Sequence, residues 1–342
     1  MADTFNYRID HHGSLVRPAE LTAARAAGDP EALREAEVKA VEEAVVLQRQ
    51  LRSTVVTDGD FPREDWRSVV LDGLSGIRRT GERGADGLVR WVADSLPKAD
   101  GPPAADWATR LAGLTVIAPK VALPSPAYLA AITYEPGRGV SCARELGESF
   151  AEIIRAEIAF LVTRGVRLIQ LNNPLLLDQV AADPAQAGAL SFEDALAVEA
   201  LAVRLDERPE GVRVGVCPGW TAPAVVDRAR AERLYAAVPA DRWILPYDQG
   251  TQAELDLLRA LPEDRDVCLG VVDATVAELE DIDTVMSRID AGAEVKDIED
   301  MAVAPSRGFA DVADRPLLDA ESQRRKLVLV ETIARYCWGN EF

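Results

Sequence analysis

The side chains best suited to acid–base chemistry are scarce in this chain and lie together. The sequence contains two histidines, the neighbours His11 and His12. An imidazole titrates near neutral pH, so we predict that both are catalytic groups that move a proton. Ser14 and Arg17 follow closely and are predicted to bind substrate, with the arginine holding an anionic group. The alternative is structural: one histidine packs in the core and the other caps the turn before Gly13.

Two carboxylates flank a glycine in the segment Asp58-Gly59-Asp60. A carboxylate in a site can accept a proton or hold a substrate amine. We therefore predict Asp60 as a catalytic residue and Asp58 as a substrate-binding residue. Because Asp-Gly is also a common turn dipeptide, the alternative is a tight turn without a chemical role.

The four cysteines are far apart and form no CxxC motif, which argues against a disulfide framework and against a zinc finger. Cys217 is predicted to be catalytic, as a thiolate nucleophile or a metal ligand, although an unpaired cysteine is often a small apolar residue of the core. Trp220 follows it and is predicted to cover a flat ligand ring, with simple packing as the alternative. The remaining cysteines are interpreted as structural: Cys142, Cys268 and Cys337.

Short apolar runs alternate with longer segments of helical periodicity. Continuous apolar runs of this length are typical of strands buried on both faces of a parallel sheet. Strand–helix alternation implies right-handed βα units, and eight of them predict a single-domain (β/α)8 TIM-like barrel over residues 1–342. A doubly wound open sheet is the alternative, but its usual GxGxxG and GxxxxGK[ST] motifs are absent. The expected strands are 5–10, 53–57, 114–118, 166–171, 212–217, 242–245, 267–272 and 301–304; the expected helices are 30–51, 143–164, 192–205, 222–236, 252–261, 276–289 and 320–336.

Residues 78–113 do not fit this repeat. The segment is rich in glycine and proline around a helix-like piece at 87–96. We predict an insertion between the second and third strands that acts as a lid, since long insertions in compact domains are often substrate loops. A solvated elaboration without catalytic weight is the alternative.

Active sites of such barrels lie at the carboxyl ends of the strands, so the residues that follow each strand are candidates. Polar side chains stand behind seven of the eight expected strands. Those predicted to bind substrate, besides the residues named above, are Asn172, Asn173, Tyr247, Asp248 and Arg307.

The charge balance limits the partners. There are 38 Lys and Arg against 57 Asp and Glu, a formal net charge of −19. Nucleic-acid phosphates and anionic membranes both need clustered basic residues, so neither is expected as a partner. No apolar run reaches the roughly 18–20 residues of a membrane span, and the first ten residues hold no signal-peptide core. We expect a cytoplasmic protein that binds a small-molecule substrate; the sequence carries no signal for an oligomeric state.

Six segments form a pattern in order along the chain: DHHGSLVRPAEL (10–21), TVVTDGDFPREDW (54–66), the helix–strand stretch at 151–174, VRVGVCPGW (212–220), VCLGVVDATVAELED (267–281) and MAVAPSRGFADV (301–312). Together they resemble the catalytic half of cobalamin-independent methionine synthase and, more widely, the superfamily that includes uroporphyrinogen decarboxylase. This resemblance implies a TIM-like barrel and methyl transfer to a thiol from a methyl-folate or methyl-corrinoid donor.

The departures from the family pattern concern its zinc site. The family holds zinc with His-x-Cys, a Glu and a second Cys. Here Gly215 stands at the histidine position, the Glu position falls near Pro246, and Arg307 stands at the second cysteine. Cys217 alone cannot build a tetrahedral site, so we predict no catalytic zinc. The alternative is a rebuilt metal site from His11, His12, Asp60 and Cys217.

Other family positions have changed while their surroundings are kept. Asp60 replaces a glutamate that binds the amino-acid substrate, Asn172 and Asn173 replace an acidic pair, and Thr275 replaces a lysine. The neighbouring HGSxxRP, TDG and RGF frames are intact. We interpret this pattern as a site rebuilt for a different ligand.

The favoured hypothesis is zinc-independent methyl transfer to a small polar metabolite, with methyl-folate at the barrel mouth and the acceptor activated by His11 or His12. A second hypothesis is a metal-free lyase or decarboxylase, in which Arg17 and Arg307 hold carboxylates and His12 or Asp60 moves the proton. Zinc-dependent homocysteine S-methyltransferase and a non-catalytic ligand-binding relative are the remaining alternatives.

Overall fold

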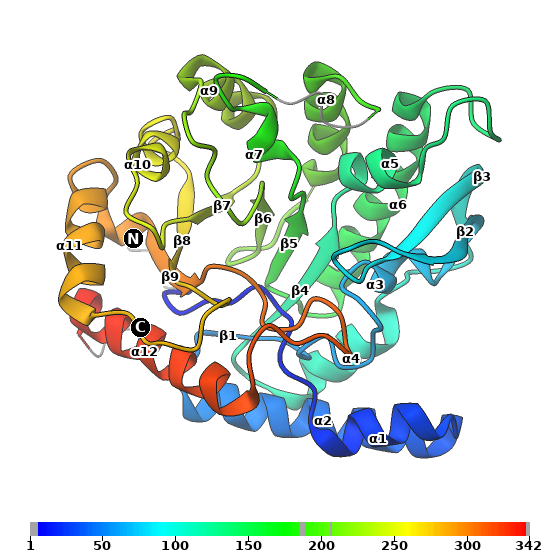
Figure 1. The fold of residues 1–342 in the computed structure, drawn as a ribbon, viewed down its shortest axis with the longest axis horizontal. Coiled ribbons are helices and arrows are strands. Elements are labelled where there is room, and N and C mark those ends of the chain that lie inside the picture. The colour runs from blue at the N-terminus through cyan, green and yellow to red at the C-terminus, as the bar shows by residue number, and fades with distance from the viewer. Residues whose placement is uncertain (1–5, 185–188, 206, 340–342) are drawn as a thin grey trace.

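A curved sheet of seven parallel strands forms the centre of the molecule, with helices packed around its outer face (Figure 1). The computed structural model describes residues 6–184, 189–205 and 207–339. The strands are neighbours in chain order: β1 (Val55–Val56), β4 (Ala118–Pro124), β5 (Leu168–Asn172), β6 (Arg213–Cys217), β7 (Arg242–Pro246), β8 (Asp266–Val272) and β9 (Met301–Pro305).

The helices alternate with these strands, and side chains accept hydrogen bonds at most of their amino ends. Ser191, for example, caps α8, and Thr251 forms a capping box with Glu254 at the start of α10. The helices are α1 (Ala19–Ala27), α2 (Pro30–Gln50), α3 (Ser68–Leu71), α4 (Ala105–Leu114), α5 (Pro126–Thr133), α6 (Ala143–Thr163), α7 (Leu176–Gln179), α8 (Phe192–Val203), α9 (Arg228–Ala237), α10 (Gln252–Arg259), α11 (Ile282–Ala293) and α12 (Ala320–Trp338).

The segment 8–10 lies between the two outer strands of this sheet. The amide of Val303 in β9 donates to the carbonyl of Arg8, and the amide of Asp10 donates back to Val303, both at 2.9 Å. On its other side, the amide of Thr54 donates to the carbonyl of Ile9 at 3.2 Å. The strand predicted at 5–10 is thus an isolated bridge at Ile9, and Phe5 lies outside the described residues.

The insertion differs from its prediction in one element. Residues 87–96 are not helical: β2 (Leu74–Arg83) and β3 (Val89–Ala99) form an antiparallel hairpin, followed by α4. In β3, Val89 and Trp91 are buried while Arg90 between them is exposed, which is the two-residue period of a strand. The apolar face of α4 also explains the misplaced third strand, since Leu114 ends this helix and the strand begins only at Ala118.

Side chains alternate between the two faces of the central sheet. Leu123, Leu171 and Val216 belong to the core under the helices. A smaller apolar cluster with Cys217 and Ile244 lies on the other face. Because register pairs link Gln170 to Gly215 and Asn172 to Cys217, the side chains that share this inner face come from neighbouring strands.

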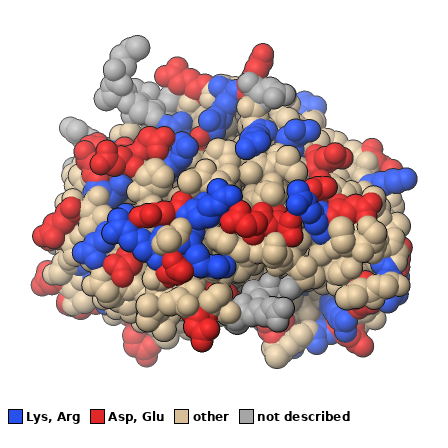
Figure 2. All heavy atoms as spheres, turned by 90° about the horizontal axis from the view of Figure 1, so that it is seen from above, with Lys and Arg blue, Asp and Glu red and all other residues tan. Residues whose placement is uncertain are grey.

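Acidic and basic side chains are interleaved on the surface seen in Figure 2, without a large area of one sign. None of the helices in the described parts of the chain combines the length and apolar character needed to cross a membrane.

Candidate active site at the carboxyl ends of the strands

A buried ion pair lies on the inner side of the sheet. The Nζ atom of Lys120 in β4 is 2.6 Å from Oδ1 of Asp10, and both side chains are at most 2% exposed. Arg242 approaches the other oxygen of Asp10 at 3.6 Å. Burial alone would raise the pKa of Asp10, but these two cations outweigh it and the net pKa is lowered. Lys120 was not predicted as a site residue. The sequence feature that could have indicated it is a lysine inside the apolar run 117–123.

His12 is held by an amide network from β5. The Nε2 atom of Gln170 lies 3.2 Å from Nδ1 of His12 and 2.7 Å from Oδ1 of Asn172. All three side chains are buried. Burial lowers the pKa of His12 to about 3, and the nearby cations Lys120 and Arg307 add to this effect.

The neighbouring imidazole of His11 lies on the other side of the backbone, towards α2 and α12, where it lines a small internal space with Gln48 and Leu327. Burial lowers its pKa to about 4. Both histidines are therefore neutral at pH 7. His12, rather than His11, is joined to the polar side chains of the inner face.

The two carboxylates of the Asp58-Gly59-Asp60 turn share one cation. One guanidinium nitrogen of Arg63 lies 2.8–2.9 Å from both oxygens of Asp58 and 3.0 Å from Asp60. Asp60 adopts a left-handed φ of +57°, which turns its side chain towards Gly13. Burial raises the pKa of Asp60 to about 6, with Asp58 contributing in the same direction and Arg63 opposing.

Arg17 and Ser14 hold loops together. The guanidinium of Arg17 donates to the backbone carbonyls of Leu15, Asp60, Arg63 and Ala310. The hydroxyl of Ser14 accepts from the amide of Ala310 at 3.3 Å. The predicted anion-binding arginine is therefore engaged with the protein backbone.

Cys217 ends β6 within the apolar cluster. Its thiol donates to the carbonyl of Gly219 over 3.6 Å, and burial raises its pKa to about 12. Cys217 is thus a neutral thiol at physiological pH, which does not favour a nucleophilic thiolate.

Trp220 and Arg307 meet across the mouth of the site. The guanidinium of Arg307 lies 4.3 Å from the centroid of the Trp220 ring and forms an ion pair with Asp311. Trp66 packs edge-to-face on Trp220, with ring centroids 5.9 Å apart, and stacks on Tyr128. Arg307 keeps 26% of its side chain exposed, so it remains accessible to a ligand.

A pocket of about 260 Å³ opens beside this pair. Its wall comes from the loops after β6, β7, β8 and β9, including Trp220, Asp248, Asp273 and Arg307. Burial raises the pKa of Asp248 to about 6. Tyr247 points elsewhere, because its hydroxyl donates to the carbonyl of Arg288 at 3.1 Å.

Asn173 is directed away from Asn172 and into the helical layer. Its amide donates to Glu199 of α8 at 2.6 Å, and the hydroxyl of Ser125, the cap of α5, donates to the same oxygen. Burial raises the pKa of Glu199 to about 7, against these hydrogen bonds. Asn173 therefore ties the end of β5 to α5 and α8.

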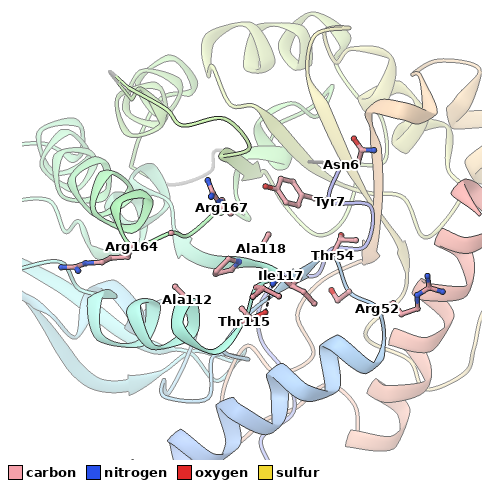
Figure 3. A pocket seen from close by; sticks show the side chains of 14 residues that line it. Asn6, Tyr7, Arg52, Thr54, Ala112, Thr115, Ile117, Ala118, Arg164 and Arg167 are labelled. Atoms are coloured by element: carbon pink, nitrogen blue, oxygen red, sulfur yellow. Dashed lines mark hydrogen bonds between the residues drawn. The ribbon is translucent and has the colours of Figure 1, made fainter. Parts of the chain in front are cut away.

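A cavity of about 800 Å³ lies at the opposite, amino end of the strands (Figure 3). It is lined by Tyr7, Thr54 and the residues around the start of β4, and by none of the predicted site residues. Arg52 and Arg164 lie at its two ends and do not converge on a common point (Figure 3). In (β/α)8 barrels, the fold predicted from the sequence, the amino face contributes to stability rather than to catalysis.

No protein-family model matches the chain. The uncharacterized proteins YxjH and YxjG of Bacillus subtilis are each 27% identical to it, in alignments that cover 97% of this chain and 95% of each relative.

Solved structures share the whole fold. A candidate vitamin-B12-independent methionine synthase from Listeria monocytogenes superposes with a TM-score of 0.73 and 22% identity over 98% of both chains. A B12-independent methionine synthase from Shewanella, in complex with selenomethionine, gives 0.77 and 17% over 97% of both chains. A methyltransferase from Methanosarcina mazei gives 0.55 and 10%, over 98% of this chain and 96% of its own. The resemblance predicted from the sequence motifs is thus confirmed at the level of the fold.

Proposed function

From the fold that this chain shares with cobalamin-independent methionine synthases, we propose that it transfers a methyl group from a methyl-folate-type donor to a small polar metabolite, without zinc. In this proposal, segment 8–10 takes the place of the first strand of an eight-stranded barrel. The reaction takes place at the carboxyl ends of the strands, where His12, Asp60 and Arg307 lie. The hairpin β2–β3 and α4 form the lid of this single domain.

The observation that carries the proposal is the chemistry at the family's zinc positions. Gly215 offers no ligand, and a Cβ atom there would lie 3.0 Å from Cδ1 of Ile244, so any side chain at this position would require Ile244 to shift. Arg307 places a cation, paired with Asp311, at another ligand position. Cys217 is a neutral thiol. This donor set does not fit a zinc ion.

In this proposal, the pterin ring of the donor binds in the pocket beside Trp220. An aromatic face suits a flat ring, and Asp248 and Asp273 offer acceptors to the amino-pyrimidine edge. When bound, methyl-folate would supply an activated methyl group. The protein would then hold the acceptor and remove its proton, and Asp60 is the carboxylate whose raised pKa suits that task.

The decarboxylase or lyase hypothesis is favoured by a different observation. Arg307 lines the pocket beside Trp220 and keeps part of its side chain exposed, and a guanidinium is suited to hold a substrate carboxylate. One set of assays, in which candidate substrates are incubated with and without methyl-folate, separates the two activities. Methyl transfer demethylates the folate, whereas decarboxylation releases carbon dioxide without any folate.

Two measurements test the proposal. Metal analysis of the purified protein should find no stoichiometric zinc, and calorimetry with 5-methyltetrahydrofolate should show binding that Asp248→Asn weakens about tenfold, as expected for loss of one charged hydrogen bond. Asp283→Asn, at an exposed position of α11, is the matched control. One tightly bound zinc per chain, or no folate binding, would overturn the proposal.

A further inference from the structure

We propose that Gln170 is a positioning residue that fixes His12 as the neutral tautomer with its proton on Nε2, so that His12 donates a hydrogen bond to a carboxylate or carbonyl oxygen of the substrate. The role of this donor in turnover rests on the proposed function. The tautomer itself rests only on the hydrogen-bond network.

The network starts on β5. Gln170 and Asn172 are two residues apart, so their side chains share the inner face of the strand. The single nitrogen of the Gln170 amide reaches both Oδ1 of Asn172, at 2.7 Å, and Nδ1 of His12, at 3.2 Å. Gln170 is 1% exposed and His12 6% exposed, so water competes little for these groups.

The orientation of the Gln170 amide follows from its two partners. The amide nitrogen of Gln170 carries two hydrogens, which match its two acceptors. The other polar atom of this side chain, Oε1, has no hydrogen-bond partner among the described residues. With Asn172 as placed, reversing the Gln170 amide would bring two carbonyl oxygens together and leave a buried NH2 group unpaired. Unpaired buried N–H groups are rarer than under-satisfied carbonyls, so the observed orientation is favoured.

The orientation decides the protonation of the imidazole. A neutral ring whose Nδ1 accepts a hydrogen bond carries its hydrogen on Nε2. The ring stays neutral because it is buried and because Lys120 and Arg307 act on it together, while Asp10 opposes them. His12 is therefore prepared to donate, and Asp60 is left as the group that accepts the proton.

The donor has no partner in the described part of the chain. Nε2 of His12 is buried without a hydrogen bond there, although buried donors are nearly always paired. A ligand atom with a lone pair would satisfy it. An oxygen of a carboxylate or a carbonyl group can accept this hydrogen bond, whereas a protonated amine has no lone pair for it. The substrate class is therefore a small carboxylate or carbonyl compound.

The scarcity of histidine makes the test direct. In protein labelled with 15N-histidine, His11→Gln leaves the ring of His12 as the only labelled side chain. Long-range 15N–1H spectra at pH 7 should show an unprotonated Nδ1 and a protonated Nε2. Protonated Nδ1 with bare Nε2 would overturn the proposal.

Variants separate positioning from packing. Gln170→Met should remove the preference of His12 for the Nε2-protonated tautomer, so that its signals report both tautomers. Gln170→Glu should instead protonate Nδ1 and raise the pKa of the ring. Gln179→Met, the same change at another buried glutamine, should leave the signals unchanged. An unchanged spectrum in Gln170→Met would contradict the proposal. Because this readout needs no turnover, failed folate binding would reject the proposed function and leave the tautomer result standing.

Discussion

Lys120 and Asp10 form a salt bridge of 2.6 Å between the side chain of β4 and the segment that leads into the two histidines. The pair is almost fully excluded from solvent and connects residues 110 positions apart. It places a compensated charge directly below the candidate active site. This pair acts electrostatically on His12, whose ring is contacted by the amide of Gln170.

Removal of Lys120 should destabilise the fold strongly. Lys120→Met leaves Asp10 with the more distant Arg242, and breaking a buried pair costs about 3–5 kcal/mol of unfolding free energy. Urea denaturation measures this loss. The pKa of Asp10 is lower in the folded state than in the unfolded state. The loss of unfolding free energy in Lys120→Met should therefore be complete above the unfolded-state pKa of Asp10 and disappear as pH falls through its folded-state pKa. Lys98→Met, at an exposed position, is the control; equal losses in both variants would contradict the role of the pair.

Turnover should depend on the deprotonated form of Asp60. Since its pKa is raised to about 6, kcat/KM for methyl transfer should fall below pH 6 and reach a plateau above it. Asp60→Asn should lower kcat about 10²- to 10⁴-fold and remove this acid limb. If the pH profile of Asp60→Asn still falls below pH 6, the acid limb belongs to another group.

Glu199 should make stability depend on pH near neutrality. Its folded pKa is raised to about 7, so the folded state holds the proton between the unfolded pKa and pH 7, and stability falls as pH rises through this window. Glu199→Gln keeps an oxygen for Ser125 and Asn173. It should therefore be nearly neutral at pH 4.5 and gain up to about 3 kcal/mol at pH 9.

Chemical denaturation at these two pH values measures the difference. Glu193→Gln on the exposed face of the same helix should show no such gain. The same stability change at both pH values would mean that Glu199 does not titrate in this window.

The close packing at Gly215 should resist a side chain. Gly215→Ala places Cβ 3.0 Å from Cδ1 of Ile244 and should cost about 1–3 kcal/mol. Ile244→Val removes that carbon, so the double variant should be more stable than the sum of the single changes predicts. If the losses of unfolding free energy in the two single variants simply add in the double variant, the side chains at 215 and 244 do not clash.

The fold was predictable where one periodicity runs through a whole element. The apolar runs of β5 to β9 and the helical spacing of α2, α6 and α12 were located to within two residues. The hairpin was missed because three consecutive buried residues, Trp91 to Ala93, interrupt the alternation of β3. The strand β4 was displaced because the apolar face of α4 runs directly into it.

The sequence predicted where the candidate site lies, but not what each of its residues contacts. The motifs bring His12, Asp60 and Arg307 to one end of the sheet, but pairing over long sequence distances decides what each residue does. Arg17 has the charge to hold an anion, yet four backbone carbonyls occupy it. Lys120 was overlooked because its partner lies more than a hundred residues earlier.

The backbone bonds between segment 8–10 and β9 have a consequence for how the protein is made. His11 and His12 directly follow a segment that is fixed by Val303, nearly three hundred residues later. Closing so long a loop is entropically costly and slow, so these contacts should form late in folding. During synthesis the histidines leave the ribosome first but acquire their surroundings only after β9 has emerged. A nascent or truncated chain that lacks β9 would then hold every histidine of the protein and no assembled site.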